Sequence, residues 1–255
     1  MRIVSLCPSL TELVFDLGVG DALVGRTKFC VHPADRVDAV EKVGGTKNPK
    51  VERILELAPD IVLMNEEENR LEDAESLRRA GIRVHTSMPR SAEETAAMVR
   101  SIGMALGRIR EAEGIAAEIE RRADRVRRTA GRYPPVRYAC LIWREPIMTV
   151  NDDTFIAGLL ALAGGQNVFA DRTDRYPSIS PAELHDADPL RVLLPDEPFP
   201  FQDRHVEELA AATGLPRERF VLADGELLSW HGSRTPRGID YAERIIHEGT
   251  LREWN

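Results

Sequence analysis

The feature that most constrains the fold is an alternation of short apolar runs with segments of helical periodicity. In the first half, each apolar run is too short for a helix and predicts a buried strand. A segment with apolar residues on one helical face follows most of these runs, and this order predicts parallel strands with helical connections. The predicted strands are 2–6, 22–27, 59–65 and 82–88, and the helices between them are 9–17, 50–58 and 70–80.

The second half repeats this order, and a long helical pattern separates the two halves. That pattern runs from about Ser91 to Arg128 and is interrupted near Gly107. The predicted strands of the second half are 136–143, 147–150, 191–196 and 219–224, and its helices are 154–164, 181–187, 203–214 and 238–248. The sequence therefore predicts two similar parallel-sheet α/β lobes joined by a long backbone helix. The expected boundaries are 1–107, 108–130 and 131–255.

Polar residues ahead of several helices predict where those helices begin. Asn48 and Pro49 are expected as the N-cap and first residue of one helix, and Asp153 as the cap of another. Three Ser-x-x-Glu sequences predict capping boxes. They are Ser9 with Glu12, Ser91 with Glu94, and Ser180 with Glu183.

Composition excludes several classes of function. The 255 residues carry a net charge of −8, which argues against a nucleic-acid-binding surface. The three cysteines, Cys7, Cys30 and Cys140, have no C-x-x-C spacing, and the six histidines show no ligand spacing, so we expect no metal site. A single Cys7–Cys30 disulfide stays open. Catalytic signatures such as G-x-S-x-G are missing, and we expect neither an enzyme nor a required cofactor.

The start of the chain bears on location. No basic and apolar leader precedes the first predicted strand, and no apolar run approaches the ~18 residues of a membrane span. These observations predict a cytoplasmic protein. The alternative is a periplasmic or membrane-associated protein whose upstream signal was removed. We also expect a monomer.

Candidate ligand contacts are loop residues that follow strands, because open α/β sheets bind ligands at the carboxyl ends of their strands. Two such lobes predict a ligand cleft between them. The candidates in the first half are Ser9, Phe29, Thr46, Lys47, Asn65 and Thr86. Those in the second half are Arg175, Tyr176, Phe199, Trp230, His231 and Arg234. Trp143, at a strand end, is expected to be buried.

The stretch "SWHGSR" (229–234) is the most informative of these loops. Its aromatic ring, imidazole and guanidinium suit a large conjugated ligand with carboxylate or amide arms. Alternatively, Trp230 packs between the lobe and the closing helix, and Arg234 caps a carboxylate. An enzyme on the same scaffold would need a titratable pair, either Cys30 with His32 or His231 with Glu226. A ligand-free interaction module is a third hypothesis.

Three segments carry a resemblance that covers nearly the whole chain. They are "RIVSLCPSLTELVFDLGVGDALVGRT", "VGGTKNPKVERILELAPDIVLMN" and "FIAGLLALAGGQNVFAD". The chain resembles the helical-backbone substrate-binding proteins of ABC importers, above all the receptors for cobalamin and iron-siderophore complexes. The resemblance implies binding of a metal complex without catalysis, and a bridging helix with little hinge motion.

The resemblance also implies a partner and a ligand class. Glutamates on each lobe would meet an ABC permease, and the matching positions are Glu72 (or Glu66 to Glu68) and Glu207 or Glu208. Cobalamin receptors stack aromatic rings on the corrinoid. The matching first-lobe positions are Thr46 or Lys47, Asn65 and Thr86, so Phe29 is the nearest ring. A corrinoid is the first expectation, and another metal chelate, such as a ferric complex, is the alternative.

Overall fold

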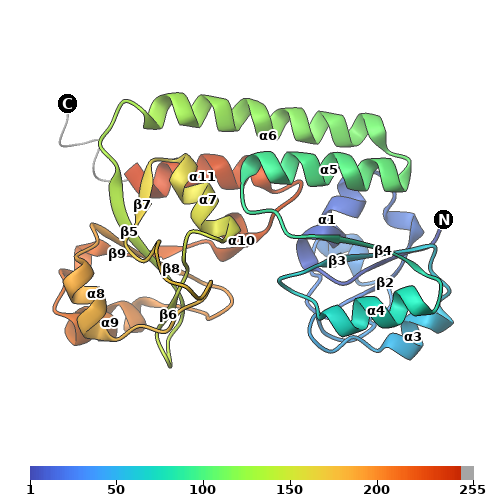
Figure 1. The fold of residues 1–255 in the computed structure, drawn as a ribbon, viewed down its shortest axis with the longest axis horizontal. Coiled ribbons are helices and arrows are strands. Elements are labelled where there is room, and N and C mark those ends of the chain that lie inside the picture. The colour runs from blue at the N-terminus through green and yellow to red at the C-terminus, as the bar shows by residue number, and fades with distance from the viewer. Residues whose placement is uncertain (248–255) are drawn as a thin grey trace. The chain divides into compact units, whose positions relative to one another are not determined.

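A computed structural model describes residues 1–247 and divides the chain into two compact units. The first unit takes in Met1–Pro89, Glu94–Glu118 and His231–Arg234. The second takes in Arg90–Glu93, Ile119–Trp230 and the chain from Thr235 onward. Helix α6 (Ile109–Ala130) contributes residues to both units (Figure 1). The fold is thus two α/β lobes joined by a helix, while the domain boundaries predicted from the sequence stay a prediction.

The first unit is built on a four-stranded parallel sheet in the order β2-β1-β3-β4. All four strands were predicted from their apolar runs, and the prediction is confirmed. The strands are β1 (Ile3–Ser5), β2 (Leu23–Arg26), β3 (Ile61–Asn65) and β4 (Arg83–Ser87). Because all run the same way, their carboxyl ends lie at one edge of the sheet. Val4 and Val62 are register partners at the centre of its core.

Five helices besides α6 complete the first unit. They are α1 (Pro8–Asp16), α2 (Ala34–Val37), α3 (Val51–Glu56), α4 (Leu71–Arg79) and α5 (Ala92–Leu106), with a short 3-10 turn η1 (Gly20–Ala22). The sequence pattern did not reveal α2, which is a single turn. Gly18, Gly81 and Gly107 follow α1, α4 and α5 in the left-handed conformation that glycine adopts easily.

Two predicted helix starts in the first unit are wrong. Helix α1 begins at Pro8 with Cys7 as N-cap and no side-chain cap, so Ser9 and Glu12 form no capping box. The Ser9 hydroxyl instead lies near His231, and the Glu12 carboxylate accepts from Arg234. Helix α3 begins at Val51, because Pro49 instead forms an isolated bridge with Gly44.

The second unit has a five-stranded sheet. Its strands are β5 (Val136–Trp143), β6 (Met148–Thr149), β7 (Gly165–Asn167), β8 (Arg191–Pro195) and β9 (Phe220–Ala223). The order is β6-β5-β8-β9, and β7 pairs with the first residues of β5. All pairs are parallel except β5 with β6, which is antiparallel. The sequence missed β7, because "GQN" is short and polar.

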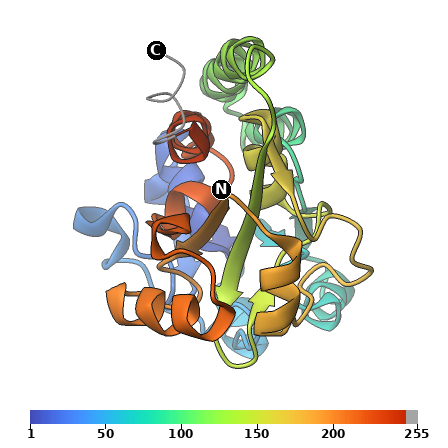
Figure 2. The same cartoon turned by 90° about the vertical axis from the view of Figure 1, so that its left-hand side faces the viewer.

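The helices of the second unit are α7 (Phe155–Leu162), α8 (Pro181–Ala187), α9 (Asp203–Thr213), α10 (Gly225–Ser229) and α11 (Thr235–His247), with a 3-10 turn η2 (Arg217–Arg219). Leu184 of α8 and Leu209 of α9 belong to the core that includes Val192 of β8. Helices α7, α10 and α11 contact one another instead. Figure 2 shows the orange α8 and α9 lying apart from the red α11.

Helix starts in the second unit are partly as predicted. The Ser180–Glu183 capping box is confirmed. The predicted cap Asp153 is wrong, because Thr154 Oγ1 accepts the bond from the Ala157 N–H and Asp153 forms ion pairs with arginines. Helix α11 begins at Thr235, three residues before its predicted start, and its predicted end at residue 248 lies outside the described residues. The sequence also missed α10.

No helix within residues 1–247 is both long enough and apolar enough to cross a membrane.

Candidate functional site at the strand ends

Asn65, the last residue of β3, is the centre of a buried polar network in the first unit. Its Oδ1 accepts bonds from the backbone N–H groups of Glu67 (2.9 Å) and Glu68 (3.2 Å). Its Nδ2 lies 2.9 Å from Nε2 of His231. Because Oδ1 is fixed by two donors, the amide NH₂ donates to His231, and Nε2 of that ring is the acceptor.

The His231 ring is buried in the first unit. Since Nε2 accepts from Asn65, the ring proton belongs on Nδ1, which lies 3.4 Å from Ser9 Oγ. Burial lowers the pKa of His231 to about 4, so the ring is neutral at pH 7. The predicted residues Ser9, Asn65 and His231 therefore lie together, in what we call the His231 network.

Asn69 extends the network to the residue after β1 and to the loop that contains Thr46. Its Nδ2 donates to the carbonyls of Leu6 (2.9 Å) and Thr46 (3.0 Å), and its Oδ1 accepts from the Asn65 N–H at 2.8 Å. Lys47 Nζ donates to the Glu67 carbonyl at 2.5 Å. Thr46 and Lys47 thus lie beside the network. Sequence reasoning missed Asn69, because it lies among the acidic residues ahead of α4.

Arg234 forms a bidentate ion pair with Glu12 of α1. Its Nε and one terminal nitrogen donate to the two carboxylate oxygens at 2.8 and 2.6 Å. The side chains are only 8% and 18% exposed. This pairing is the carboxylate cap that the sequence left open for Arg234, and it explains why Glu12 forms no capping box. Gly232, between His231 and Arg234 in the chain, has a φ of +102°, a conformation that glycine adopts easily.

Phe29 is the exposed aromatic ring among the first-unit candidates. It follows β2 and is 50% exposed, with Lys28 Nζ 4.8 Å from the ring centroid. Its ring packs close to Gly45, where a Cβ atom would lie 3.4 Å from it. Thr86 is half-buried within β4, in register with Met64 of β3. Thr86 therefore lies in the sheet, one residue before the strand ends.

In the second unit, Trp143 and Phe199 form an aromatic pair at the ends of β5 and β8. Their ring centroids are 5.6 Å apart in an edge-to-face arrangement, a favourable geometry for two rings. Trp143 is 41% exposed, so its predicted burial is wrong. It is the last residue of β5, and the five strand residues before it, 138–142, are buried. Phe199 also packs against Phe201 and His205.

Trp230 is buried and its indole is fixed by Glu197. The indole N–H donates to Glu197 Oε1 at 2.6 Å, and Ser229 Oγ donates to the same oxygen at 3.1 Å. Burial raises the pKa of Glu197. Gly225 is required here, because a Cβ at this position would lie 2.4 Å from Glu197 Cγ. Trp230 is thus a buried side chain of the second unit, and its packing against the closing helix stays a prediction.

Arg175 and Tyr176 lie together in the loop between β7 and α8. Arg175 Nε donates to the Asp153 carbonyl at 2.7 Å and lies 3.3 Å from the Asp153 carboxylate. Its guanidinium is 5.9 Å from the centroid of the Tyr176 ring. Both side chains are half-buried. The loop therefore presents a cation beside a ring.

The glutamates predicted to meet a partner differ in their surroundings. Glu72 is exposed in the first turn of α4, and Glu66 is exposed at the end of β3. Glu207 pairs with Arg217 at 2.7 Å, and Glu208 pairs with Arg144 at 2.6 Å. The acidic residues of the second unit are thus partly neutralised by their own arginines. Their role in partner docking stays a prediction.

The titratable pairs considered for an enzyme find no support in the geometry. The Cys30 thiol is buried between Thr11 and Thr27, and burial raises its pKa. A buried neutral thiol is a poor nucleophile. His231 bonds to Ser9 and Asn65 in the first unit. Cys7, Cys30 and Cys140 are all free, so the disulfide left open is not formed. Residues 1–247 contain no group of three His, Cys, Asp or Glu suited to a metal.

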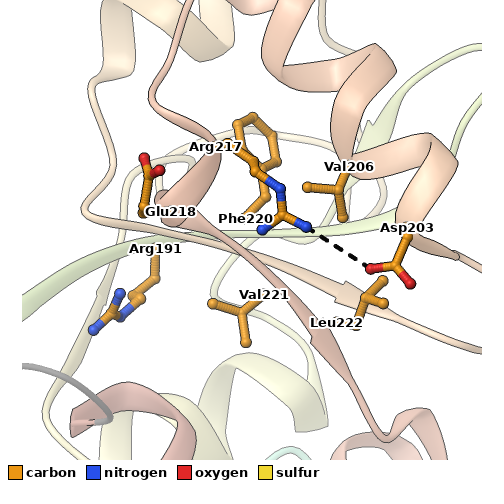
Figure 3. Close-up of a pocket in the computed structure, with 8 residues that line it drawn as sticks. All are labelled: Arg191, Asp203, Val206, Arg217, Glu218, Phe220, Val221 and Leu222. Atoms are coloured by element: carbon orange, nitrogen blue, oxygen red, sulfur yellow. Dashed lines mark ion pairs between the residues drawn. The ribbon is translucent and has the colours of Figure 1, made fainter.

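A pocket of about 390 Å³ lies in the second unit along the edge strand β9 (Figure 3). It includes the first residues of β8 and β9 and a side of α9, with Arg217 reaching Asp203 at 3.9 Å. Its lining residues are Arg191, Asp203, Val206, Arg217, Glu218, Phe220, Val221 and Leu222. None of the residues predicted to contact the ligand lines it.

Comparison with known families decides the class of the protein. The model of the family described as periplasmic binding protein matches residues 3–212. The chain belongs to the periplasmic binding protein family. The expected cytoplasmic location is therefore wrong, because members of this family are periplasmic. That expectation rested on the residues ahead of the first strand, and the family match outweighs them.

Individual members of the periplasmic binding protein family agree with this assignment. The vitamin B12-binding protein of Vibrio cholerae serotype O1 is 22% identical over 244 residues, which cover 96% of this chain and 87% of that protein. The crystal structure of a Vibrio cholerae periplasmic vitamin B12-binding protein shares the fold, with a TM-score of 0.84, 21% identity and coverage of 100% and 98%. The structure of the periplasmic heme-binding protein of Roseiflexus sp. RS-1 matches with a TM-score of 0.82 and 26% identity. The match covers 96% of this chain and 97% of that protein.

For the predicted site, the structure places the residues but does not test their roles. Ser9, Thr46, Lys47, Asn65 and His231 come together in the first unit. In the second unit, Phe199 pairs with Trp143, and Arg175 lies beside Tyr176. The ligand cleft stays a prediction, as do the ligand contacts of all these residues. As in its relatives in the periplasmic binding protein family, the chain's role is that of a ligand-binding protein.

Proposed function

We propose that the protein binds a corrinoid or a related metal chelate, without catalysis, as the substrate-binding component of an ABC importer. The observation that carries this proposal is the exposed Trp143 at the carboxyl end of β5, paired with the half-buried Phe199 in the loop after β8. An indole that is 41% exposed at a strand end is a large apolar surface in the place where α/β sheets bind ligands. The names of the relatives support a metal macrocycle as the ligand.

A flat macrocycle matches the chemistry of these side chains. Aromatic faces bury large apolar areas at a low cost in side-chain entropy, and they stack on conjugated rings. The half-buried Arg175, beside Tyr176, is proposed to meet carboxylate or amide arms of the ligand, since guanidinium groups bind such arms with directed hydrogen bonds. Phe29 is proposed as the ligand-contacting ring of the first unit.

Heme is a second candidate ligand. Its support is the 26% identity to the Roseiflexus heme-binding protein, together with the lack of rings at Thr46, Asn65 and Thr86. Corrinoids and heme share a planar tetrapyrrole-type ring around a metal. The residues proposed above suit either ring, so the ligand has to be identified by direct binding.

A permease is the proposed partner. Glu72 in the first unit and Glu207 or Glu208 in the second are the proposed docking residues, because they are exposed on helices. Arginines of the partner would have to compete with Arg217 and Arg144 for the second-unit glutamates. The first-unit residue Glu72 is therefore the better target for a docking variant.

The test is a titration of the purified protein with cobalamin, cobinamide and hemin, followed by absorbance. We expect at least one of them to bind with a Kd in the micromolar range or below. Replacing Trp143 by Ala should weaken binding about tenfold, since losing one ring contact costs about 1.4 kcal/mol. Leu222→Ala is the control, because Leu222 is also exposed (39%) but lies on the edge strand β9. No response to any of the three compounds would refute the proposal.

A further inference from the structure

Arg26, the last residue of β2, is a buried arginine outside the His231 network. Its side chain is 1% exposed, and it is among the largest fully buried side chains of the described chain. Arginine is rarely buried to this degree. Its backbone belongs to the sheet, and its N–H donates to the Glu41 carbonyl. The buried position of its charge therefore calls for an explanation beyond strand formation.

The guanidinium connects two points of the segment 27–38 that carries Phe29. One terminal nitrogen donates to the Cys30 carbonyl at 2.7 Å, and the other donates to the Asp38 carboxylate at 2.7 Å. Cys30 is the neighbour of Phe29 in the chain, and Asp38 caps the end of α2. The Arg26 side chain thus links Cys30 and Asp38 within the segment from Thr27 to Asp38.

The Cys30 side chain adds a second set of anchors to the same point. Thr11 Oγ1 donates to Cys30 Sγ at 3.0 Å, and Thr27 Oγ1 lies 3.2 Å from it. Cys30 is fully buried, while the residues on either side, Phe29 and Val31, are 50% and 46% exposed. The backbone is therefore held at Cys30, and both apolar neighbours point outward.

Global stability is a poor explanation for this arrangement. Burying a charge carries a large desolvation cost, and replacing a buried ion pair by well-packed apolar residues often leaves stability unchanged or improved. The carboxylate partner Asp38 is 80% exposed, so the pair is only half buried. Nε of Arg26 has no hydrogen-bond partner within residues 1–247. What the guanidinium does supply is a fixed geometry for the loop.

We infer that Arg26 is a positioning residue that holds Phe29 in place as a ligand contact. The inference rests on the proposed function, in which Phe29 touches the macrocycle. A ring that is fixed before binding loses less conformational freedom when the ligand binds. Arg26 itself touches no ligand and acts through the Cys30 carbonyl.

The first experiment is a double-mutant cycle between Arg26→Met and Phe29→Ala, read as the Kd for whichever of cobalamin, cobinamide or hemin binds the full chain. Arg26→Met should weaken binding about tenfold on its own, and less than twofold when Phe29 is already Ala, because coupled residues are not additive. Arg26→Lys, which keeps the charge and one of the two bonds, should fall between. An equal loss from Arg26→Met in both backgrounds would overturn the inference.

A second variant serves if Arg26→Met fails to fold. Asp38→Ala removes one end of the connection at an exposed position, and Asp35→Ala in the same loop is the matched change of charge. Asp38→Ala should weaken binding about threefold, and Asp35→Ala should leave it unchanged. Equal effects of the two would overturn the inference.

A third measurement needs no ligand and so separates this inference from the proposed function. Amide hydrogen exchange in the peptide spanning 27–38 should accelerate at least tenfold in Asp38→Ala or Arg26→Met, with exchange in β3 unchanged. Unchanged exchange in 27–38 would refute the positioning role even if every ligand titration failed. A wild-type chain that binds none of the three compounds would refute only the proposed function.

Discussion

At the scale of single residues, the clearest feature of the molecule is a histidine that is held neutral. His231 is buried, accepts a bond from Asn65 and faces Ser9, and burial lowers its pKa to about 4. Protonation would direct an Nε2–H toward the Asn65 NH₂ group. Two donors would then face each other in a buried site, which is costly. The network therefore depends on the neutral ring.

This dependence predicts how stability changes with pH. The pKa of an unfolded histidine is about 6.5, so below that pH the unfolded chain takes up a proton that the folded chain refuses. The contribution of His231 is complete above pH 6.5 and is lost as the pH falls toward 4. Between pH 7 and pH 4 the free energy of unfolding should fall by about 3 kcal/mol from this residue.

The measurement is urea unfolding of the wild type and of His231→Gln at pH 7 and pH 4. The difference in unfolding free energy between the two proteins should shrink at pH 4, because the variant has no ring to protonate. The raised pKa values of Asp16 and Glu197 act in the opposite direction, but equally in both proteins. Parallel loss of stability in both proteins would contradict the assignment.

At the scale of elements, the sequence predicted strands better than helix starts. Each predicted strand is present because a short apolar run between helices has few alternatives to burial. The Ser9–Glu12 and Asp153 starts failed because these capping side chains have partners elsewhere. Ser9 faces His231, and Glu12 pairs with Arg234, both from a segment more than 200 residues away in the sequence. The residues around a helix start therefore cannot reveal such distant partners.

The candidate site shows the same division. The sequence could place candidates at the strand ends, since parallel strands place their loops at one edge of a sheet, but their ligand contacts stay a prediction. Their partners Asn69, Glu197 and Arg26 were missed, because an amide, a carboxylate and a guanidinium are ordinary surface residues in sequence. Trp143 was misplaced for a related reason. Trp143 continues the apolar run of β5, but the run of buried residues ends at Ile142.

Helix glycines give a prediction at this scale. Gly114 of α6 has open space where a Cβ would be, whereas a Cβ on Gly103 of α5 would lie 2.1 Å from Cβ of Ala112 and 3.0 Å from the Arg108 carbonyl oxygen. Gly114→Ala should stabilise the protein by about 0.5–1 kcal/mol, through lower backbone entropy in the unfolded chain. Gly103→Ala should destabilise it by about 1–3 kcal/mol, because the added methyl group would overpack the close contact between α5 and α6. Urea unfolding at pH 7 measures both, and a loss of stability in Gly114→Ala would contradict the argument.

At the scale of the whole molecule, ligand binding and stability are linked. A ligand that binds only the folded chain raises its unfolding free energy by RT ln(1 + [L]/Kd), which is about 2.7 kcal/mol at a hundredfold excess over Kd. For a chain of this size, that corresponds to a rise in Tm of roughly 5–10 °C. Each compound that binds in the titrations should produce this shift, and a compound that does not bind should leave Tm unchanged.

The rise in Tm also separates specific from non-specific binding of an apolar macrocycle. Trp143→Ala, which should weaken binding about tenfold, lowers the expected gain at the same ligand concentration by about 1.4 kcal/mol. The Tm rise should therefore drop by roughly half, while Leu222→Ala should keep the full rise. Hemin or a corrinoid that changes its absorbance on mixing but leaves Tm unchanged would be binding the folded and unfolded chain alike. An absorbance change without a rise in Tm would therefore not count as evidence for a specific binding site.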